Sequence, residues 1–94
     1  MSYSIRFTEE GKEELHKLHI ENQSKIKSAL KNLSNNLNLG KALAGRLLGF
    51  HSITVGNCRA IYTIDKEIIL VHYAGYRKDI YSKFEQSLFK SVDS

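Results

Sequence analysis

Residues 53–62 read Ile-Thr-Val-Gly-Asn-Cys-Arg-Ala-Ile-Tyr, and this stretch decides the fold. Its central Gly-Asn pair lies between two apolar, β-branched runs and predicts a two-residue hairpin turn, because both residues tolerate the positive φ that such turns need. The turn places Thr54 opposite Arg59. Successive side chains of a strand point to opposite faces, so Ser52, Thr54 and Arg59 are expected on one face. The sequence therefore predicts a cation held beside two hydroxyls on a sheet face.

The single cysteine of the chain, Cys58, is expected on the other, apolar face of this hairpin, where a buried thiol is inert. One cysteine cannot form an intrachain disulfide, which favours a reducing compartment. No apolar run approaches the roughly 20 residues of a membrane span, and no signal-peptide pattern is present. We therefore expect a cytoplasmic protein without a membrane partner.

The length and charge of the chain set further limits. Its 94 residues predict one domain, residues 1–94, with a single core. The formal net charge of +4 is consistent with an anionic partner, although many soluble proteins carry such a charge without binding nucleic acid.

The first part of the chain predicts a strand and two helices. Residues 3–7 alternate between apolar and polar side chains, as in a half-buried strand. Thr8 is a candidate N-cap of the first helix, and Asn22 or Ser24 is expected to open the second. The apolar positions of the two helices follow helical spacing: Leu15, Leu18, Ile26, Leu30, Leu33 and Leu37.

The second part predicts three strands and a final helix. The strands are expected at residues 47–55, 58–64 and 68–74, with Asp65-Lys66 as the second turn, and helical spacing returns from Asp79. This order predicts an α+β fold. Its economical arrangement is a curled antiparallel four-stranded sheet with an N-terminal helical hairpin on one face and a C-terminal helix.

His72 is a candidate catalytic residue whose position depends on strand register. A two-residue turn at Asp65-Lys66 places His72 opposite Arg59, where an imidazole could act as general acid or base near neutral pH. A three-residue turn would place Tyr73 there instead. A lone strand histidine is more often structural, so both interpretations stay open.

The combined pattern resembles a known family. The chain carries Leu48-Gly49, the Val-Gly-Asn-Cys-Arg of residues 55–59, Ile61-Tyr62, and the Tyr-Arg-Lys-Asp-Ile-Tyr of residues 76–81. With the order of elements, these features resemble the RelE/ParE superfamily of toxins from type II toxin–antitoxin modules, from residue 3 to about residue 84. The resemblance implies a small basic protein held inactive by an antitoxin. RelE toxins cleave mRNA in the ribosomal decoding site, whereas ParE toxins poison DNA gyrase.

The resemblance also implies roles for three residues. Arg59 matches the hairpin arginine that RelE-type enzymes use on the phosphate, Arg77 the arginine after the last strand, and Tyr81 the tyrosine beyond it. Guanidinium groups suit the negative charge that builds on a phosphate during cleavage, because they stay protonated and present a planar fork. Tyr81 would stack on a base or take part in proton transfer. Ser52 and Thr54 stand where the well-studied bacterial RelE carries two lysines.

The remaining candidate residues fall into two surfaces. An RNA- or ribosome-binding rim is expected from Lys41, Arg46, Ser52, Thr54 and Lys78. The apolar strip of the last helix would suit antitoxin docking, and it consists of Phe84, Leu88 and Phe89. Core packing is the alternative for Phe84 and Leu88. The single cysteine and scattered histidines form no metal-ligand set, so neither a metal nor a cofactor is expected.

We therefore expect a ribosome-dependent mRNA endoribonuclease that inhibits translation, with antitoxin, ribosome and mRNA as partners. The alternative is a ParE-like inhibitor that binds DNA gyrase and cleaves nothing. A third interpretation is a degenerate, antitoxin-bound protein without toxicity.

Overall fold

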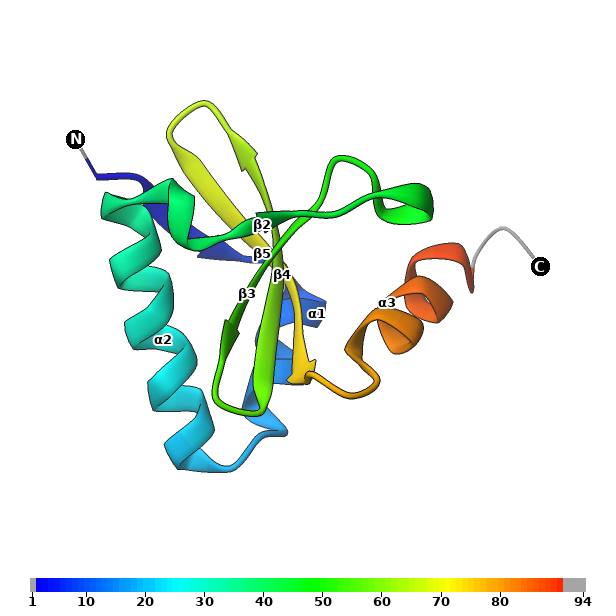
Figure 1. Cartoon of the computed structure of the whole chain (residues 1–94). Helices are drawn as coiled ribbons and strands as arrows, with labels where there is room; N and C mark the ends of the chain where they lie inside the picture. Colours follow the sequence, from blue (N-terminus) through cyan, green and yellow to red (C-terminus); the bar gives the residue numbers. More distant parts are fainter. Residues whose placement is uncertain (1, 91–94) are drawn as a thin grey trace.

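The computed structural model describes residues 2–90, which form five strands, three α-helices and two short 3-10 turns (Figure 1). In chain order these are β1 (Ser4–Phe7), α1 (Glu9–His16), α2 (Ile20–Asn35), η1 (Leu37–Leu39), β2 (Lys41–Ala42), η2 (Gly45–Leu47), β3 (His51–Val55), β4 (Cys58–Asp65), β5 (Ile68–Tyr76) and α3 (Ile80–Phe89).

The strands form one mixed sheet in the order β1-β5-β4-β3-β2. The predicted α+β class is confirmed, but two details of the sheet prediction are wrong. β1 runs parallel to β5, so the sheet is not purely antiparallel. The two-residue β2 adds a fifth strand beside β3. Such a short strand leaves no periodic pattern in a sequence, and strand direction depends on the path of the intervening helices.

The register of the β3–β4 hairpin is the one predicted. Thr54 pairs with Arg59, and Val55 pairs with Cys58 across the turn. Gly56 has a φ of 59°, which a glycine adopts without steric cost. Cys58 is fully buried, and burial raises the pKa of its thiol. The local sequence thus sets which side chains share each face of the hairpin.

The helical hairpin packs on one face of the sheet, as predicted. Thr8 caps α1, since its Oγ1 accepts a hydrogen bond from the Gly11 N–H at 2.9 Å. The predicted start of α2 is wrong: the helix begins at Ile20, because the imidazole of His19 accepts the Glu21 N–H at 3.3 Å and acts as the cap. The core on this face joins both helices to the sheet: Leu15, Leu18, Ile26, Leu30, Leu33, Ile53, Cys58, Ala60, Tyr62, Ile69, Val71 and Ala74.

The predicted strand at residues 47–55 is four residues too long. The chain instead makes a 3-10 turn at Gly45–Leu47, and Gly49 has a φ of 98°, so β3 begins only at His51. Leu47 is buried in this turn and anchors it to a second, smaller core. Apolar residues in a run therefore need not form a strand when glycines allow the backbone to turn.

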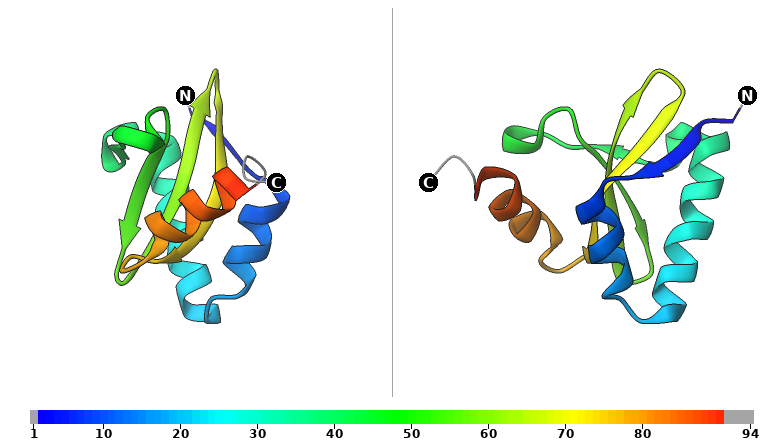
Figure 2. Two further views of the ribbon diagram at one scale, coloured as in Figure 1. Left: turned by 90° about the vertical axis from the view of Figure 1, so that its right-hand side faces the viewer. Right: turned by 180° about the vertical axis from the view of Figure 1, so that it is seen from behind.

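The second core lies on the other face of the sheet, under α3. Its buried members come from η2, β4, β5 and α3: Leu47, Ile61, Tyr73, Ile80 and Phe84. Figure 2 shows α3 on the side of the sheet away from α2. The sheet therefore lies between the α1–α2 hairpin and α3, and the α3 side carries Arg59.

Burial in the second core gives a prediction for alkaline solution. Burial, followed by the nearby Glu14 carboxylate, raises the pKa of Tyr73 from 10.0 to about 12. The folded protein keeps this phenol neutral at pH values where the unfolded chain ionises, so stability is unaffected below pH 10 and falls between pH 10 and 12. The shift of about two pKa units corresponds to a full loss of about 3 kcal/mol from this group, since one unit corresponds to about 1.4 kcal/mol, and about half of this loss is reached at pH 11.

Urea unfolding at pH 8 and pH 11 measures this loss. Tyr73→Phe removes the titrating hydroxyl and should reduce the decrease. Tyr3→Phe, at the residue before β1, removes a partly buried phenol and is the matched control. An equal decrease in wild type and Tyr73→Phe would contradict the assignment.

Candidate active site beside the hairpin

Arg59 is the centre of the candidate site. It lies on β4, between Thr54 of β3 and Gly75 of β5, on the sheet face that α3 covers in part. Its Nη1 donates a hydrogen bond to the Tyr81 hydroxyl, and its Cζ lies 4.8 Å from the centre of the Tyr81 ring. Within residues 2–90, the Arg59 guanidinium makes no other hydrogen bond and no ion pair. It therefore keeps further N–H groups that can donate to a ligand.

Tyr81 reaches this position from the first turn of α3. Its half-buried ring packs against the second core, and its hydroxyl lies 2.9 Å from the Ser52 Oγ on β3. Ser52 is 3% exposed, so it contacts the Tyr81 hydroxyl from the protein interior and does not itself form part of the surface. The Ser52, Arg59 and Tyr81 side chains thus form one polar network that links β3, β4 and α3.

Arg77 lies at the same end of the sheet as Arg59. The backbone N–H of Arg77 donates to the carbonyl of Asn57 in the hairpin turn at 2.8 Å. Arg77 also comes two residues after Gly75, which pairs with Arg59 across the sheet. The Arg77 side chain is exposed. None of the ion pairs among residues 2–90 includes Arg59 or Arg77, and Asp79, the nearest carboxylate in sequence, pairs with Lys83 at 3.3 Å.

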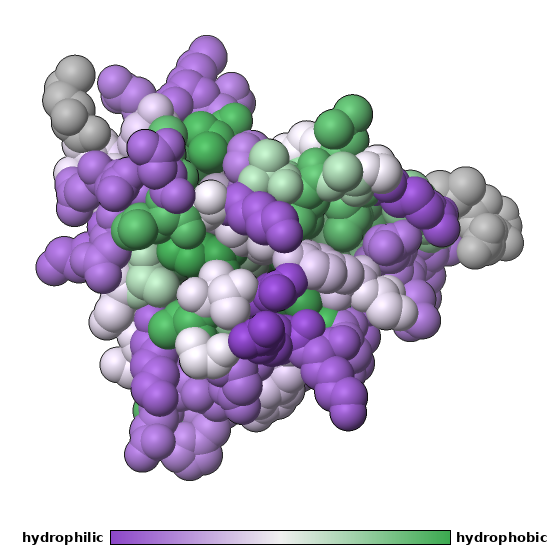
Figure 3. Space-filling model, viewed as in Figure 1, coloured by the Kyte–Doolittle hydropathy of each residue, from purple (hydrophilic) through white to green (hydrophobic). Residues whose placement is uncertain are grey.

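The electrostatic surroundings favour an anion. No Asp or Glu occurs in residues 22–64, a segment that holds six Lys or Arg side chains and includes α2 after its first two residues, β3 and nearly all of β4. Figure 3 shows hydrophilic surface running down the middle of the face that Figure 1 presents, between hydrophobic areas on both sides. A phosphate near Arg59 would therefore meet little opposing negative charge.

The predicted position of His72 opposite Arg59 is wrong. The turn between β4 and β5 lies at Lys66 and Glu67, where Lys66 has a φ of 56°, and a bulge at His72 shifts the register, so that Gly75 lies opposite Arg59. The Nε2 of His72 lies 2.9 Å from the Thr63 Oγ1. Thr63 is four residues from Arg59, or about 13 Å along the strand. Burial lowers the pKa of His72, which favours its neutral form.

The predicted RNA-binding rim divides into separate groups. Thr54, Lys41 and Lys78 are exposed. Arg46 is occupied at the other end of α3, where its Nε lies 3.7 Å from the Glu85 carboxylate and its Cζ 4.3 Å from the Phe89 ring centre. Arg46 therefore joins η2 to α3, a contact that its isolated position in the sequence did not indicate.

The apolar strip of α3 is also divided. Phe84 is 2% exposed and belongs to the second core, as in the core-packing alternative. Leu88 is 38% exposed, and Phe89 is half-buried beneath Arg46. Leu88 thus remains as the exposed residue of the predicted antitoxin surface.

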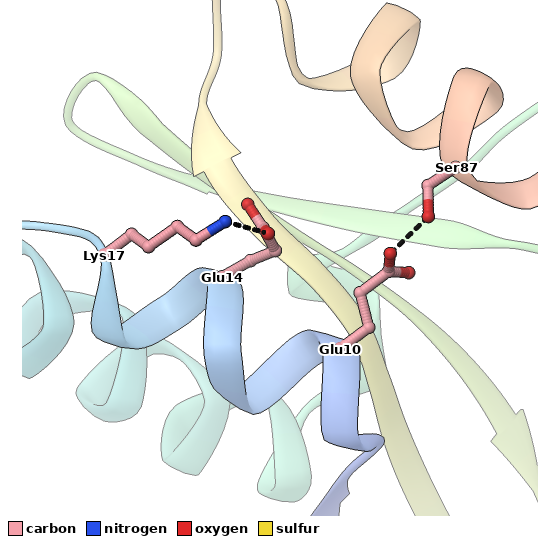
Figure 4. A network of polar contacts seen from close by, with 4 residues as sticks. All are labelled: Glu10, Glu14, Lys17 and Ser87. Atoms are coloured by element: carbon pink, nitrogen blue, oxygen red, sulfur yellow. Dashed lines mark hydrogen bonds and ion pairs between the residues drawn. The ribbon is translucent and has the colours of Figure 1, made fainter.

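Contacts between α1 and α3 were not expected from the sequence. Figure 4 shows the Ser87 hydroxyl of α3 donating to the Glu10 carboxylate of α1, beside a local pair at the end of α1. In that local pair, the Lys17 Nζ lies 2.8 Å from the Glu14 carboxylate. The Glu10–Ser87 bond joins residues 77 positions apart. It holds the C-terminal half of α3 while Tyr81 holds the first turn.

No three His, Cys, Asp or Glu side chains gather as a metal-ligand set within residues 2–90. In the same part of the chain, no helix is long and apolar enough to cross a membrane.

Comparison with solved structures gives the class of protein. A chain of the toxin–antitoxin complex RelBE2 from Mycobacterium tuberculosis is 30% identical, with a TM-score of 0.76 over 82% of this chain and 100% of that chain. A mutant of Escherichia coli toxin RelE in the free state is 22% identical, with a TM-score of 0.74 over 93% and 98%. A chain of the chromosomal ParDE system from Pseudomonas aeruginosa is 13% identical, with a TM-score of 0.65 over 80% and 96%. The fold is that of toxins from toxin–antitoxin modules.

The chain belongs to the RelE/ParE toxin superfamily, since the RelBE2 similarity extends over the full length of its counterpart. No protein-family model and no curated protein matches its sequence significantly. The similarity to both RelE and ParE structures leaves the target of the toxin to be inferred from the site.

Proposed function

We propose that this toxin is a metal-independent endoribonuclease that cleaves mRNA on the ribosome and is held inactive by a cognate antitoxin. The proposal rests on the placement of the Arg59 guanidinium, which Tyr81 holds in position and which keeps N–H groups free to donate. Arg59 lies at the same end of the sheet as the exposed Arg77. Two permanent cations that form no ion pair with the carboxylates of residues 2–90 suit a phosphodiester and the extra charge of its transition state.

The proposed reaction uses the RNA as its own nucleophile. The 2′ hydroxyl loses its proton to solvent as its oxygen attacks the adjacent phosphorus, a P–O2′ bond forms, and the P–O5′ bond breaks as the 5′ oxygen takes up a proton. The products are a 2′,3′-cyclic phosphate and a free 5′ hydroxyl. Negative charge builds on the non-bridging oxygens during the attack, and Arg59 and Arg77 would stabilise it through charge-assisted hydrogen bonds.

Tyr81 has two roles in this proposal. Its ring and hydroxyl hold the Arg59 guanidinium in place, and its hydroxyl is the proton-transfer group closest to Arg59. Because the phenol oxygen accepts from Arg59, its own proton can be directed to Ser52 or to the leaving 5′ oxygen. Ser52 then acts as a positioning residue for Tyr81.

Primer extension on an mRNA in a cell-free translation system tests the proposal. New ends within codons, formed only when ribosomes translate the message, are the expected result. Intact mRNA together with blocked DNA supercoiling in a gyrase assay would contradict the nuclease and support the ParE-like alternative. Intact mRNA with normal supercoiling would contradict both activities.

Two substitutions at Tyr81 separate its roles. Tyr81→Phe keeps the ring under Arg59 but removes the hydroxyl, and we expect about 100-fold slower cleavage, as for loss of a proton-transfer group. Tyr81→Ala also releases Arg59 and should be slower still. Full cleavage by Tyr81→Phe would show that the hydroxyl transfers no proton. Ser82→Ala, at the next and exposed position of α3, is the matched control.

A further inference from the structure

Lys41 is a cation on β2, at the edge of the sheet, and its side chain belongs to the face of the candidate site. It pairs with Ser52 in the register between β2 and β3. Residues directly opposite each other in an antiparallel pair point to the same face. The Ser52 hydroxyl lies 2.9 Å from the Tyr81 hydroxyl of α3. The register therefore directs Lys41 to the α3 side of the sheet, which also carries Arg59.

The next two residues of the chain agree with this direction. The Leu43 N–H donates at 2.9 Å to the carbonyl just before β3, so the pairing extends past β2 by one residue. Leu43 packs in the second core, on the α3 side. Ala42 pairs with His51, whose ring stacks on Tyr62 in the core of the opposite side. Since successive side chains alternate between faces, Lys41 and Leu43 share the α3 side.

Lys41, Ser52 and Arg59 lie on three neighbouring strands, and the Tyr81 hydroxyl contacts the last two. Arg59 pairs with Thr54, which is two residues from Ser52 along β3. A strand spacing of about 4.8 Å and a rise of about 3.4 Å per residue then separate the Cα atoms of Lys41 and Arg59 by about 12 Å. The two cations therefore lie on opposite sides of the Tyr81 hydroxyl. This placement suits neighbouring phosphates of one strand better than a single shared phosphate.

The charge of Lys41 is open to a ligand. The side chain is exposed, and within residues 2–90 no carboxylate forms an ion pair with it. Arg46, the next cation along the chain, is instead paired with Glu85 and covers the Phe89 ring. Figure 3 shows hydrophilic surface at the place where β2 crosses β3 in Figure 1. Of these two residues of the predicted rim, Lys41 is the one that can take up an anion beside Tyr81.

We propose that Lys41 binds the mRNA phosphate next to the one that Arg59 holds, so that the RNA strand crosses the site from β4 toward β2. This inference rests on the proposed nuclease function and adds a substrate subsite to it. Lys41 would hold the strand in place through a charge-assisted hydrogen bond, while Arg59 and Arg77 act on the phosphate that reacts. The inference separates Lys41 from the rest of the predicted rim, because its ligand is the message and not ribosomal RNA.

A double-mutant cycle between protein and substrate tests the inference. Ribosomes carry a short synthetic mRNA in which the phosphate on the 5′ or the 3′ side of the cleaved linkage is replaced by a neutral methylphosphonate. On unmodified mRNA, Lys41→Ala should slow cleavage at least ten-fold, as for loss of one hydrogen bond to a charged group. One methylphosphonate should slow the wild type to the same degree, and Lys41→Ala should then add no further loss. The methylphosphonate on the other side should leave the full effect of Lys41→Ala.

Two further variants serve as controls. Lys41→Arg keeps the charge and should restore most of the rate, whereas Lys31→Ala, at an exposed position of α2 on the opposite side of the sheet, should change nothing. Thermal unfolding should give the same midpoint for all three variants.

Three outcomes would count against the inference. An unchanged rate for Lys41→Ala would overturn it. A loss that is equal on all three mRNAs would place Lys41 on ribosomal RNA and would overturn it as well. The absence of cleavage by the wild type would contradict the proposed function itself, and this inference with it.

Discussion

Replacing Arg59 with alanine is expected to slow mRNA cleavage by about 100- to 1000-fold, the effect of removing one preorganised donor from a developing oxyanion. The side chain is fixed before substrate arrives, because Tyr81 holds its guanidinium and Ser52 holds Tyr81. Little reorganisation is then needed as charge builds on the phosphate. Primer extension at matched protein concentrations measures the rate, and thermal unfolding shows whether the variant is folded.

Three further variants make this result specific. Arg59→Lys keeps the charge but loses the planar fork, so we expect partial activity. Arg77→Ala removes an exposed side chain and should reduce cleavage to a similar degree without loss of stability. Arg6→Ala removes the same charge from β1 and should leave the rate unchanged. A folded Arg77→Ala variant that still arrests growth in cells would rule out this site.

Features set by neighbouring residues could be predicted from the sequence. The β3–β4 pairing follows from the turn residues Gly56 and Asn57, and the predicted Thr54–Arg59 pair is present. The cap at Thr8 follows from its short side chain before two glutamates. Each of these depends on a few consecutive residues, and hence on physical preferences that a sequence displays directly.

Features set by distant contacts could not be predicted. The contact of Tyr81 with Ser52 spans 29 positions and depends on where α3 packs on the sheet. The position of His72 depends on the turn, which lies one residue later than predicted, and on one inserted residue in β5, which no local pattern marks. The two shifts together place Gly75 opposite Arg59 in place of His72. A shift by one residue exchanges the faces of a strand, so a small error in register changes the membership of a site.

Gly11→Ala is expected to lower the free energy of unfolding by about 2 kcal/mol, although alanine is intrinsically favoured over glycine in a helix by about 1 kcal/mol. The added Cβ would lie 2.4 Å from the Val71 carbonyl oxygen and 3.1 Å from the carbonyl carbon of His72. This backbone is held in place, since the Val71 oxygen accepts the Thr8 N–H at 2.9 Å, so α1 must move away from β5.

Moving α1 away from β5 breaks buried contacts that α1 makes when residue 11 is glycine. Thermal and urea unfolding should show a melting temperature lowered by about 10 °C, at about 4–8 °C per kcal/mol for a domain of this size. Glu13→Ala, exposed on the same helix, is the control and should change stability by less than about 0.5 kcal/mol. A Gly11→Ala variant as stable as wild type would mean that α1 does not pack this closely on β5.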